Sequence, residues 1–305
     1  MKTKYIALAL GAMLAGLAFT ACNKDDSGDD GQSTSSAFNQ NGATLSRFSV
    51  SPTKQVRFSR GNLQYRSSTN AWRFAENQYD FIAEGNRNIS SAYSGWIDLF
   101  GWGTSGWNSG AVAYRPWSAS ETCEDYQPGG SPNTDLTGSY AEADWARHNV
   151  INNGGNSTHM WRTLTTEEWQ YLFTGRSGAN TKYGSATIVG SDGLSNHGVI
   201  ILPDSWTQPS GVSFNIGMNG WSSNTYNLNQ WKKMESAGAV FLPAGGSRYG
   251  QTVYGNSYDM WGYYWSATHH NSSKAKYLLF NEEALHADYQ YDRCEGMAVR
   301  PVMDI

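Results

Sequence analysis

YYWSATHHNSSKAKYLLFNEEALHADYQYDRCEGMAVRPV, residues 263–302, alternates large apolar residues with His, Asn, Tyr, Asp and Glu. Neighbouring side chains of a β-strand point to opposite faces, so this pattern predicts strands with two different faces. The even-numbered positions from Lys276 to Phe280 would share one face, and the odd-numbered positions from Tyr277 to Asn281 would share the other. Because the first face has two typical core residues, we expect the second face to point outward and to hold a ligand.

The N-terminus has the pattern of an export signal. Lys2 and Lys4 precede an apolar run over residues 5–19, and small residues follow immediately before Cys22. A charged start, a short apolar core and a small-residue end are typical of a secretory signal peptide. The run is too short for a membrane-spanning helix. We therefore expect residues 1–21 to be a cleaved signal peptide.

The position of Cys22 resembles the end of a bacterial lipoprotein signal, which is cleaved before a cysteine that is then acylated. The next residues, Lys24-Asp25-Asp26, resemble the surface-export signal of Bacteroidetes lipoproteins. These resemblances imply lipidation at Cys22 and an outer-membrane lipoprotein that is exposed on the cell surface. The alternatives are an ordinary signal peptide with a chance cysteine, and charges that only keep the segment solvated.

Residues 22–46 are rich in Ser, Gly, Asn and Asp and poor in large apolar side chains. Such a segment buries too little surface to offset its ordering entropy, so we expect a flexible acidic tether. No Pro/Ser-rich break divides residues 47–305, and their length suits one large domain.

The composition indicates a loop-rich extracellular domain. Charged residues make up 16% of the chain and aromatic residues 14%, with 13 Trp and 33 Gly. This profile fits irregular structure stiffened by aromatic packing better than a charged helical domain. The formal net charge is −4 and Lys and Arg do not cluster, which argues against nucleic acid as a partner.

Three helices and several short strands are expected. The clearest helix begins with Thr165 as its N-cap and Glu168 in the reciprocal capping-box position, and ends near Gly175. Two others cover about 141–151 and about 229–236. The strands show as alternating or continuously apolar runs, which lie at residues 56–59, 63–65, 72–74, 199–202 and 239–242. Few helices, many short strands and long ordered loops make an α+β fold.

Two sets of residues have more than one interpretation. Trp96, Trp102 and Trp107 are interleaved with glycine. Tryptophans spaced in this way could stack on sugar rings, but we expect them to fill the core beneath long loops. Once Cys22 is assigned to lipid, two cysteines remain (Cys123 and Cys294), which either form a disulfide or stay as buried thiols.

Six strings in order resemble the Fibrobacter succinogenes major paralogous domain family, secreted or lipid-anchored proteins with a C-type-lectin-like fold. They are FSRGNLQY (58–65), WRFAENQYDFI (72–82), GWIDLFGWGTSGW (95–107), WRTLTTEEWQYLF (161–173), GAVFLPAGGSR (238–248) and the ending at 263–302. The resemblance covers nearly all of 47–305. It implies one C-type-lectin-like domain, a fold that formylglycine-generating enzymes share, and it leaves the ligand open.

The ending also resembles the variable proteins of diversity-generating retroelements, in which codons near the 3′ end are rewritten and the fold displays the changed residues. That resemblance implies that Trp265, Leu278, Phe280, Gly296 and Val299 are scaffold. It implies as ligand-binding residues His269, His270, Asn271, Tyr277, Leu279, Asn281, Glu283, His286, Asp288, Tyr289, Tyr291 and Asp292.

Other chemistry finds less support in the sequence. Calcium-binding lectins carry Glu-Pro-Asn or Gln-Pro-Asp, whereas here Gln127-Pro128 is followed by Gly129, and no cluster of oxygen ligands is evident. Adjacent histidines on a strand, such as His269 and His270, point in opposite directions and do not chelate a metal simply. No cofactor, catalytic or metal site is therefore expected.

We expect a surface-displayed lipoprotein that binds an unknown protein or glycan through residues 263–302. The main alternative is a structural or adhesin-tip subunit whose C-terminal face packs on a partner. A formylglycine-generating type of enzyme, which uses a close cysteine pair, is the less favoured third possibility.

Overall fold

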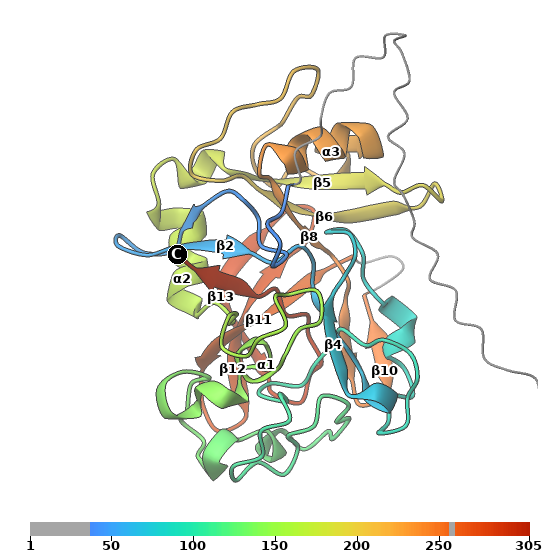
Figure 1. The fold of residues 1–305 in the computed structure, drawn as a ribbon, viewed down its shortest axis with the longest axis vertical. Coiled ribbons are helices and arrows are strands. Elements are labelled where there is room, and N and C mark those ends of the chain that lie inside the picture. The colour runs from blue at the N-terminus through green and yellow to red at the C-terminus, as the bar shows by residue number, and fades with distance from the viewer. Residues whose placement is uncertain (1–36, 256–259) are drawn as a thin grey trace, which may run out of the picture. The chain divides into compact units, whose positions relative to one another are not determined.

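The computed structural model describes residues 37–255 and 260–305, which belong to one compact unit (Figure 1). The expected signal peptide (residues 1–21) and the acylation site at Cys22 lie outside the described residues. Within them, five small β-sheets and three short α-helices are joined by long loops and 3₁₀ turns. The α+β class is therefore confirmed.

The elements follow one another along the whole described chain. The helices are α1 (Trp145–His148), α2 (Thr166–Gln170) and α3 (Leu228–Ser236). The strands are β1 (Phe48–Ser49), β2 (Gln55–Phe58), β3 (Leu63–Arg66), β4 (Ala71–Phe74), β5 (Tyr183–Val189), β6 (Ser195–Ile201), β7 (Thr225–Asn227), β8 (Val240–Pro243), β9 (Ser247–Tyr249), β10 (Thr252–Tyr254), β11 (Gly262–His269), β12 (Lys274–Phe280), β13 (Leu285–Asp292) and β14 (Val302–Asp304).

The sheet that carries the C-terminal segment has the order β11-β12-β13 and is antiparallel. On the even-numbered face of its middle strand, Leu278 and Phe280 are fully buried in one core. On the odd-numbered face, Tyr277 and Leu279 join a second core that contains Trp265. The predicted division into two faces is confirmed, and both faces contact a core.

The expectation that the odd-numbered face points outward is wrong for two of its residues. Tyr277 is only 3% exposed and Leu279 only 5%. The cause is a tryptophan-rich core against this face, in which Trp265 meets the Tyr277 ring at 6.2 Å between centroids. An alternation of residue types shows that a strand has two faces, but it does not show whether a loop or a core covers the second.

The expected scaffold residues are all buried, which confirms that part of the prediction. Gly296 has a steric reason to be glycine: a Cβ atom there would lie 3.1 Å from three side-chain atoms of Arg248. The backbones of these two residues also pair, since each N–H donates to the carbonyl of the other. The chain after β13 is thereby fixed against β9.

A second, four-stranded sheet has the order β7-β5-β6-β8, with α3 nearby in Figure 1. α3 places Trp231 and Met234 in the core beside Phe241 of β8. The helix predicted over 229–236 and the strands predicted at 199–202 and 239–242 correspond to α3, β6 and β8 and are confirmed.

The helix predicted from Thr165 is confirmed at its start and changed at its end. The Thr165 hydroxyl accepts from the backbone N–H of Glu168, and the Glu168 carboxylate accepts from the backbone N–H of Thr165. After Gln170 the chain continues as a π-helical turn to Gly175. The helix predicted over 141–151 is wrong in extent, since a 3₁₀ segment precedes α1 and α1 has only four residues.

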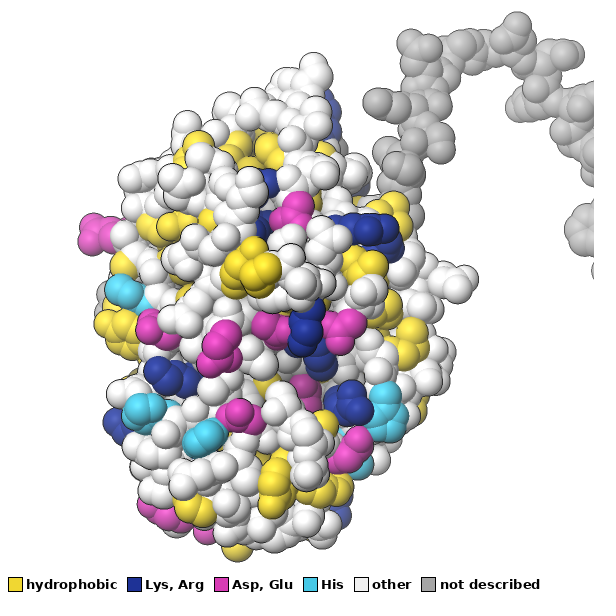
Figure 2. Space-filling model, turned by 90° about the vertical axis from the view of Figure 1, so that its left-hand side faces the viewer, with side chains coloured by type: hydrophobic (Ala, Val, Ile, Leu, Met, Phe, Trp, Pro, Cys, Tyr) yellow, Lys and Arg dark blue, Asp and Glu magenta, His cyan; other side chains and the backbone are white. Residues whose placement is uncertain are grey.

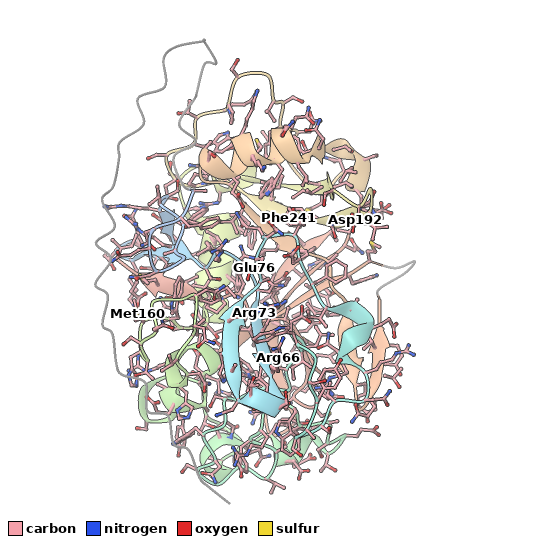
Figure 3. All side chains as sticks on the ribbon, turned by 45° about the vertical axis from the view of Figure 1, so that its right-hand side comes forward. Arg66, Arg73, Glu76, Met160, Asp192 and Phe241 are labelled. Carbon is pink, nitrogen blue, oxygen red and sulfur yellow. A yellow bond between two sulfur atoms is a disulfide. The ribbon has the colours of Figure 1, made fainter. Side chains whose placement is uncertain are left out.

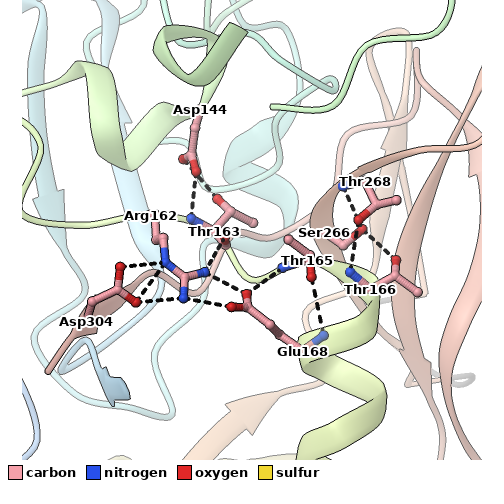
Figure 4. A network of polar contacts seen from close by, with 9 residues as sticks. All are labelled: Asp144, Arg162, Thr163, Thr165, Thr166, Glu168, Ser266, Thr268 and Asp304. Atoms are coloured by element: carbon pink, nitrogen blue, oxygen red, sulfur yellow. Dashed lines mark hydrogen bonds and ion pairs between the residues drawn. The ribbon is translucent and has the colours of Figure 1, made fainter. Parts of the chain in front are cut away.

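An arginine links the start of α2 to the C-terminal strand (Figure 4). Arg162 donates to both carboxylate oxygens of Glu168, at 2.6 and 2.8 Å, and to both of Asp304, at 2.7 to 3.0 Å. Its backbone also pairs with Val302 in both directions. The side chains of Arg162 and Glu168 are 20% and 9% exposed, so this ion pair is largely removed from water.

The end of the segment predicted as a tether (22–46) belongs to the folded unit. Ala43 and Thr44 are buried, and Ala43 forms a β-bridge with Ser59. The Asn39 side chain accepts from the backbone N–H groups of Asn41 and Ala43, which makes a compact turn. The domain boundary predicted at residue 47 is therefore too late, because small polar residues can form a hydrogen-bonded turn as readily as a tether.

The expected core role of the glycine-spaced tryptophans is confirmed for Trp102 and Trp107 but not for Trp96, which is half-buried and lies outside the core clusters. Trp102 is fully buried, and Trp107 packs against the same core. Trp96 is covered by two guanidinium groups, since those of Arg66 and Arg73 lie 4.3 and 4.0 Å from its ring centroid. Because these two guanidinium groups cover the Trp96 ring, it offers less surface for stacking on a sugar.

Candidate functional site

A cleft of about 660 Å³ opens beside the odd-numbered face of β12, and we call it the tyrosine cleft. Strands β9 to β13 and the turn that follows β13 form its walls. It is lined by Ser247, Tyr249, Tyr254, Trp261, Tyr263, Tyr277, Leu279, Tyr289, Tyr291, Asp292, Glu295 and Met297. A concave site of this size, largely aromatic with a few polar groups, is typical of a ligand pocket.

The aromatic side chains form a continuous array with two orientations. The rings of Trp261, Tyr263 and Tyr277 follow one another at 6.3 and 5.9 Å and are nearly parallel. Tyr289 and Tyr291 stand at 79° to the Tyr277 ring, at 6.2 and 6.4 Å. The cleft therefore presents ring surfaces that meet close to a right angle.

The register of the sheet brings these rings together. Tyr277 of β12 is the cross-strand partner of Tyr289, and Tyr291 pairs with Ala275, two residues away. Residues two apart on a strand share a face, so Tyr289 and Tyr291 lie beside Tyr277. Tyr289 is 44% exposed and Tyr291 is 45% exposed, which leaves their outer surfaces available to a ligand.

Two carboxyl groups lie among the rings. Glu295 is 8% exposed, and its Oε2 atom is buried without a hydrogen-bond partner within the described residues. Asp292 is half-buried. Across the described parts of the chain, no Lys, Arg or His forms an ion pair with either group. A buried carboxyl oxygen without a partner is costly, and such groups occur where function requires them.

The nearest buried cation uses its donors elsewhere. The two terminal nitrogens of the fully buried Arg248 donate to the carbonyl oxygens of Leu99, Ser118 and Gly250, while its Nε has no hydrogen-bond partner among the described residues. The pKa of the Glu295 carboxyl consequently rises from 4.5 to about 7, chiefly because burial disfavours its ionised form and then because of the negative charge on Asp292. Arg248 and a hydrogen bond from Ser247 lower this pKa by a smaller amount.

The raised pKa of Glu295 should be visible in the stability of the protein. Between pH 4.5 and about 7 the unfolded chain has lost this proton while the folded chain retains it, so stability falls as pH rises through this window. In Glu295→Gln, the decrease in the free energy of unfolding between pH 4.5 and about 7 should be smaller than in the wild-type protein by roughly 2–3 kcal/mol, measured by urea unfolding. The pKa of Asp98 is also raised by burial, but its effect on stability is the same in both proteins and cancels in the comparison. Equal pH slopes for the two proteins would contradict the prediction.

A smaller hollow of about 210 Å³ adjoins the cleft and shares three residues with it. Leu279, Tyr289 and Trp261 lie in both, and Asn281 and His286 line the smaller hollow alone. The His286 ring lies 4.7 Å from that of Tyr289. The register shifts between Tyr277 and Leu279, and this shift places His286 opposite Leu279 on the cleft side.

Seven of the twelve predicted ligand-binding residues thus lie at the cleft or the hollow beside it. Five line the cleft: Tyr277, Leu279, Tyr289, Tyr291 and Asp292. The buried pair, Tyr277 and Leu279, contributes to its wall from within and does not project from the surface. The Asn281 side chain also closes the turn after β12, since its oxygen accepts from two backbone N–H groups.

The other five predicted residues lie elsewhere. His269 bonds through Nδ1 to Asp135 at 2.6 Å, and Asn271 closes the turn between β11 and β12. His270 lies in the same turn. Glu283 is exposed in the β12–β13 turn. Asp288 directly precedes Tyr289, which faces the cleft, so it points to the opposite face and accepts from Gln170 of α2. None of these five lines the cleft.

The sequence pattern missed more than half of the cleft. Its missed residues are Ser247, Tyr249, Tyr254, Trp261, Tyr263, Glu295 and Met297. Glu295 is the most informative omission, since it follows Cys294 directly and the string Arg-Cys-Glu-Gly carries no alternation. A carboxylate beside residues expected in the core was the one available signal.

The two cysteines whose pairing the sequence left open form a disulfide. Cys123 and Cys294 are joined, with 4.7 Å between their Cα atoms. Cys294 is buried beside Tyr126, and Tyr249 of the cleft wall packs against the same cluster. The disulfide therefore fixes a long loop to the back of the cleft.

A separate hollow of about 510 Å³ lies between the β3–β4 region and the β5–β6 turn. Figure 3 labels Arg73, Glu76 and Asp192 from its wall. Its charged groups already have partners: Arg73 donates to Gln64, lies over Trp96 and pairs with Glu76. This hollow is consequently a less suitable candidate for ligand binding than the tyrosine cleft.

The surface gives little further guidance. On the face shown in Figure 2, acidic and basic side chains are interspersed. Within residues 37–255 and 260–305 no helix is long and apolar enough to cross a membrane. Comparison of the chain with known protein families, with curated proteins and with solved structures finds no match.

Proposed function

We propose that this protein is a surface-displayed lipoprotein that binds a ligand in the tyrosine cleft. The observation that carries the proposal is that one cavity contains both exposed aromatic rings and a buried carboxyl group, Glu295, whose Oε2 has no hydrogen-bond partner among the described residues. Tyrosine suits this role because it offers a large, stiff contact area with few rotatable bonds. The proposal includes a C-type-lectin-like fold, a lipid anchor at Cys22 and diversification of the C-terminal codons.

The exposed aromatic residues support this use of the cleft. Tyr254, Tyr289 and Tyr291 are 52%, 44% and 45% exposed, and they are the aromatic members of the exposed large hydrophobic residues in the described chain. All three line the same cleft. Exposed aromatic residues that gather in one place indicate a contact surface, whereas scattered ones do not.

The test is a ligand-observed NMR screen with monosaccharides, single amino acids, alkylammonium ions and aromatic carboxylates. We expect at least one class to bind wild-type protein and to bind Tyr289→Ala/Tyr291→Ala at least about tenfold more weakly, because stacking surface is lost. Tyr114→Ala, which removes a half-buried tyrosine outside the cleft, is the matched control and should bind normally.

Two results would contradict the proposal. One is a panel without any binder that depends on Tyr289 and Tyr291. The other is a large loss of stability in the double variant, which would favour the structural or adhesin-tip alternative, in which this face packs on a partner. Both substituted side chains are nearly half exposed, so we expect a change of at most about 1 kcal/mol in the free energy of unfolding.

A further inference from the structure

We propose that the tyrosine cleft binds an alkylammonium cation, with the positive charge beside Glu295 and Asp292 and the alkyl groups against the aromatic rings. This inference rests on the proposed function and names the chemical class of the ligand. Primary ammonium groups, as on a lysine side chain, and quaternary ammonium groups, as on choline, share the required chemistry.

The ring geometry is the first reason. Cations are attracted to the face of an aromatic ring, and sites for alkylated ammonium groups surround the cation with several rings at steep angles. Here Tyr277 meets Tyr289 and Tyr291 at 79°, while Trp261 and Tyr263 extend the parallel side of the array. Because Tyr277 is buried, the ring surfaces open to an alkylammonium group are mainly those of Tyr254, Tyr289 and Tyr291, which all line the cleft.

The charge of the cleft is the second reason. Glu295 and Asp292 are its two ionisable acids, and no Lys or Arg is among the residues that line it. Lys274 is the cross-strand partner of Asp292, yet within the described chain it forms no ion pair with that carboxylate. A cation in the cleft would add positive charge beside two carboxyl groups that have no ion-pair partner among the described residues, whereas an anion would meet two like charges.

The polar inventory of the cleft disfavours a sugar. Recognition of a sugar requires several hydrogen-bonding groups that match its hydroxyls. Apart from the tyrosine hydroxyls and the Trp261 indole N–H, the polar side chains of the cleft are those of Ser247, Asp292 and Glu295. An alkylammonium ion instead needs negative charge and apolar contact, and the lining provides both.

Binding of a cation should depend on pH because Glu295 must be ionised. The groups that act on its carboxyl are Asp292, Arg248 and the Ser247 hydroxyl, and the Tyr277 and Tyr291 rings stand beside it in the cleft. With its pKa at about 7, the ionised fraction rises about tenfold between pH 6 and pH 8, and the apparent affinity should rise with it. A quaternary ammonium ion does not titrate, so the dependence reports the protein.

The experiment measures binding of choline, Nα-acetyl-lysine amide and 3,3-dimethylbutan-1-ol to the full chain without its signal peptide, by NMR titration. The third compound has the shape of choline without its charge. We expect choline or the lysine derivative to bind at least about tenfold more tightly than the neutral alcohol, because the charge provides the main attraction. The comparison of the first two compounds identifies the preferred ammonium type.

Two variants locate the charge effect. Glu295→Gln should weaken binding of the preferred cation at least about fivefold and abolish the rise between pH 6 and pH 8. Glu283→Gln makes the same change in the exposed turn after β12 and should alter neither quantity. Should Glu295→Gln fold poorly, the pH dependence of the wild-type protein and the neutral alcohol still test the proposal.

The proposal is overturned if the neutral alcohol binds as tightly as choline and the lysine derivative, or if neither cation binds at millimolar concentrations. It is also overturned if affinity for the cation is constant between pH 6 and pH 8. A sugar or an aromatic acid that binds in a Tyr289- and Tyr291-dependent manner, while the cations do not, would refute the cation and leave the proposed function intact. Absence of all cleft-dependent binding would refute both.

Discussion

Replacement of Arg162 by methionine is expected to lower the free energy of unfolding by about 3–5 kcal/mol, because a largely buried carboxylate loses its counter-charge. Glu168 is 7% exposed, and its oxygens accept from Arg162 and from the N-cap of α2. Methionine fills similar volume, so the loss reports the charge and the hydrogen bonds. The same change releases Asp304 of β14 from the start of α2 (Figure 4).

Urea unfolding of four proteins would separate these contributions. Arg162→Lys retains the charge but not the paired hydrogen bonds, so its loss should be smaller, at about 1–2 kcal/mol. Asp304→Asn alters a side chain that is 62% exposed, and we expect a loss below about 1 kcal/mol. A loss below about 1 kcal/mol for the methionine variant would show that Glu168 is solvated in solution, contrary to the structure.

Local sequence signals predicted the start of α2, but they did not predict its anchor. The capping box depends on residues three apart, and it was identified from Thr165 and Glu168 alone. The bond from Arg162 to Asp304 joins positions 142 apart in the sequence. No local pattern contains such a pair, and three fully buried arginines (Arg248, Arg293 and Arg300) were missed for the same reason.

The binding site was predictable only as far as strand alternation extends. Tyr289 and Tyr291 were expected to be available to a ligand, and both are exposed in the cleft. Counted back from Tyr289, alternation places Asp288 on the opposite face, where it lies, but it fails at His286, because one extra residue in β13 brings His286 to the cleft side. It also says nothing of Tyr249 and Trp261, which reach the cleft from other elements.

Some residues of the tyrosine cleft form its rigid wall, and others are available to contact a ligand. The Tyr277 ring of β12 packs against Trp265 and the tryptophan core, and the exposed rings of Tyr289 and Tyr291 in β13 contact Tyr277. Glu295 is held without a hydrogen-bond partner for one oxygen, at a cost in stability. A rigid frame that retains an unfavourable carboxyl is what a preformed cation site requires, because little ordering is left to occur on binding.

Removal of the disulfide is the second large effect, since it closes an unusually long loop. Cys123 and Cys294 are 171 residues apart, and the chain-entropy relation gives about 5 kcal/mol for such a loop, near the upper end of measured values. We expect Cys123→Ala/Cys294→Ala to lose about 3–5 kcal/mol, measured by urea unfolding. Dithiothreitol should produce a similar loss in the wild-type protein and none in the double variant.

The disulfide should also stabilise the cleft locally, in addition to its effect on global stability. Cys294 immediately precedes Glu295, and Tyr249 of the cleft wall packs against its cluster. Removal of the disulfide should increase the exchange rate of the amide hydrogens over 293–297 more than that of the amide hydrogens of β5 and β6, which lie in another sheet. Uniformly faster exchange across the whole domain would mean that the disulfide acts only on global stability. Unchanged stability after complete reduction, verified by thiol counting, would show that the packing around Tyr126 holds this loop without a covalent bond.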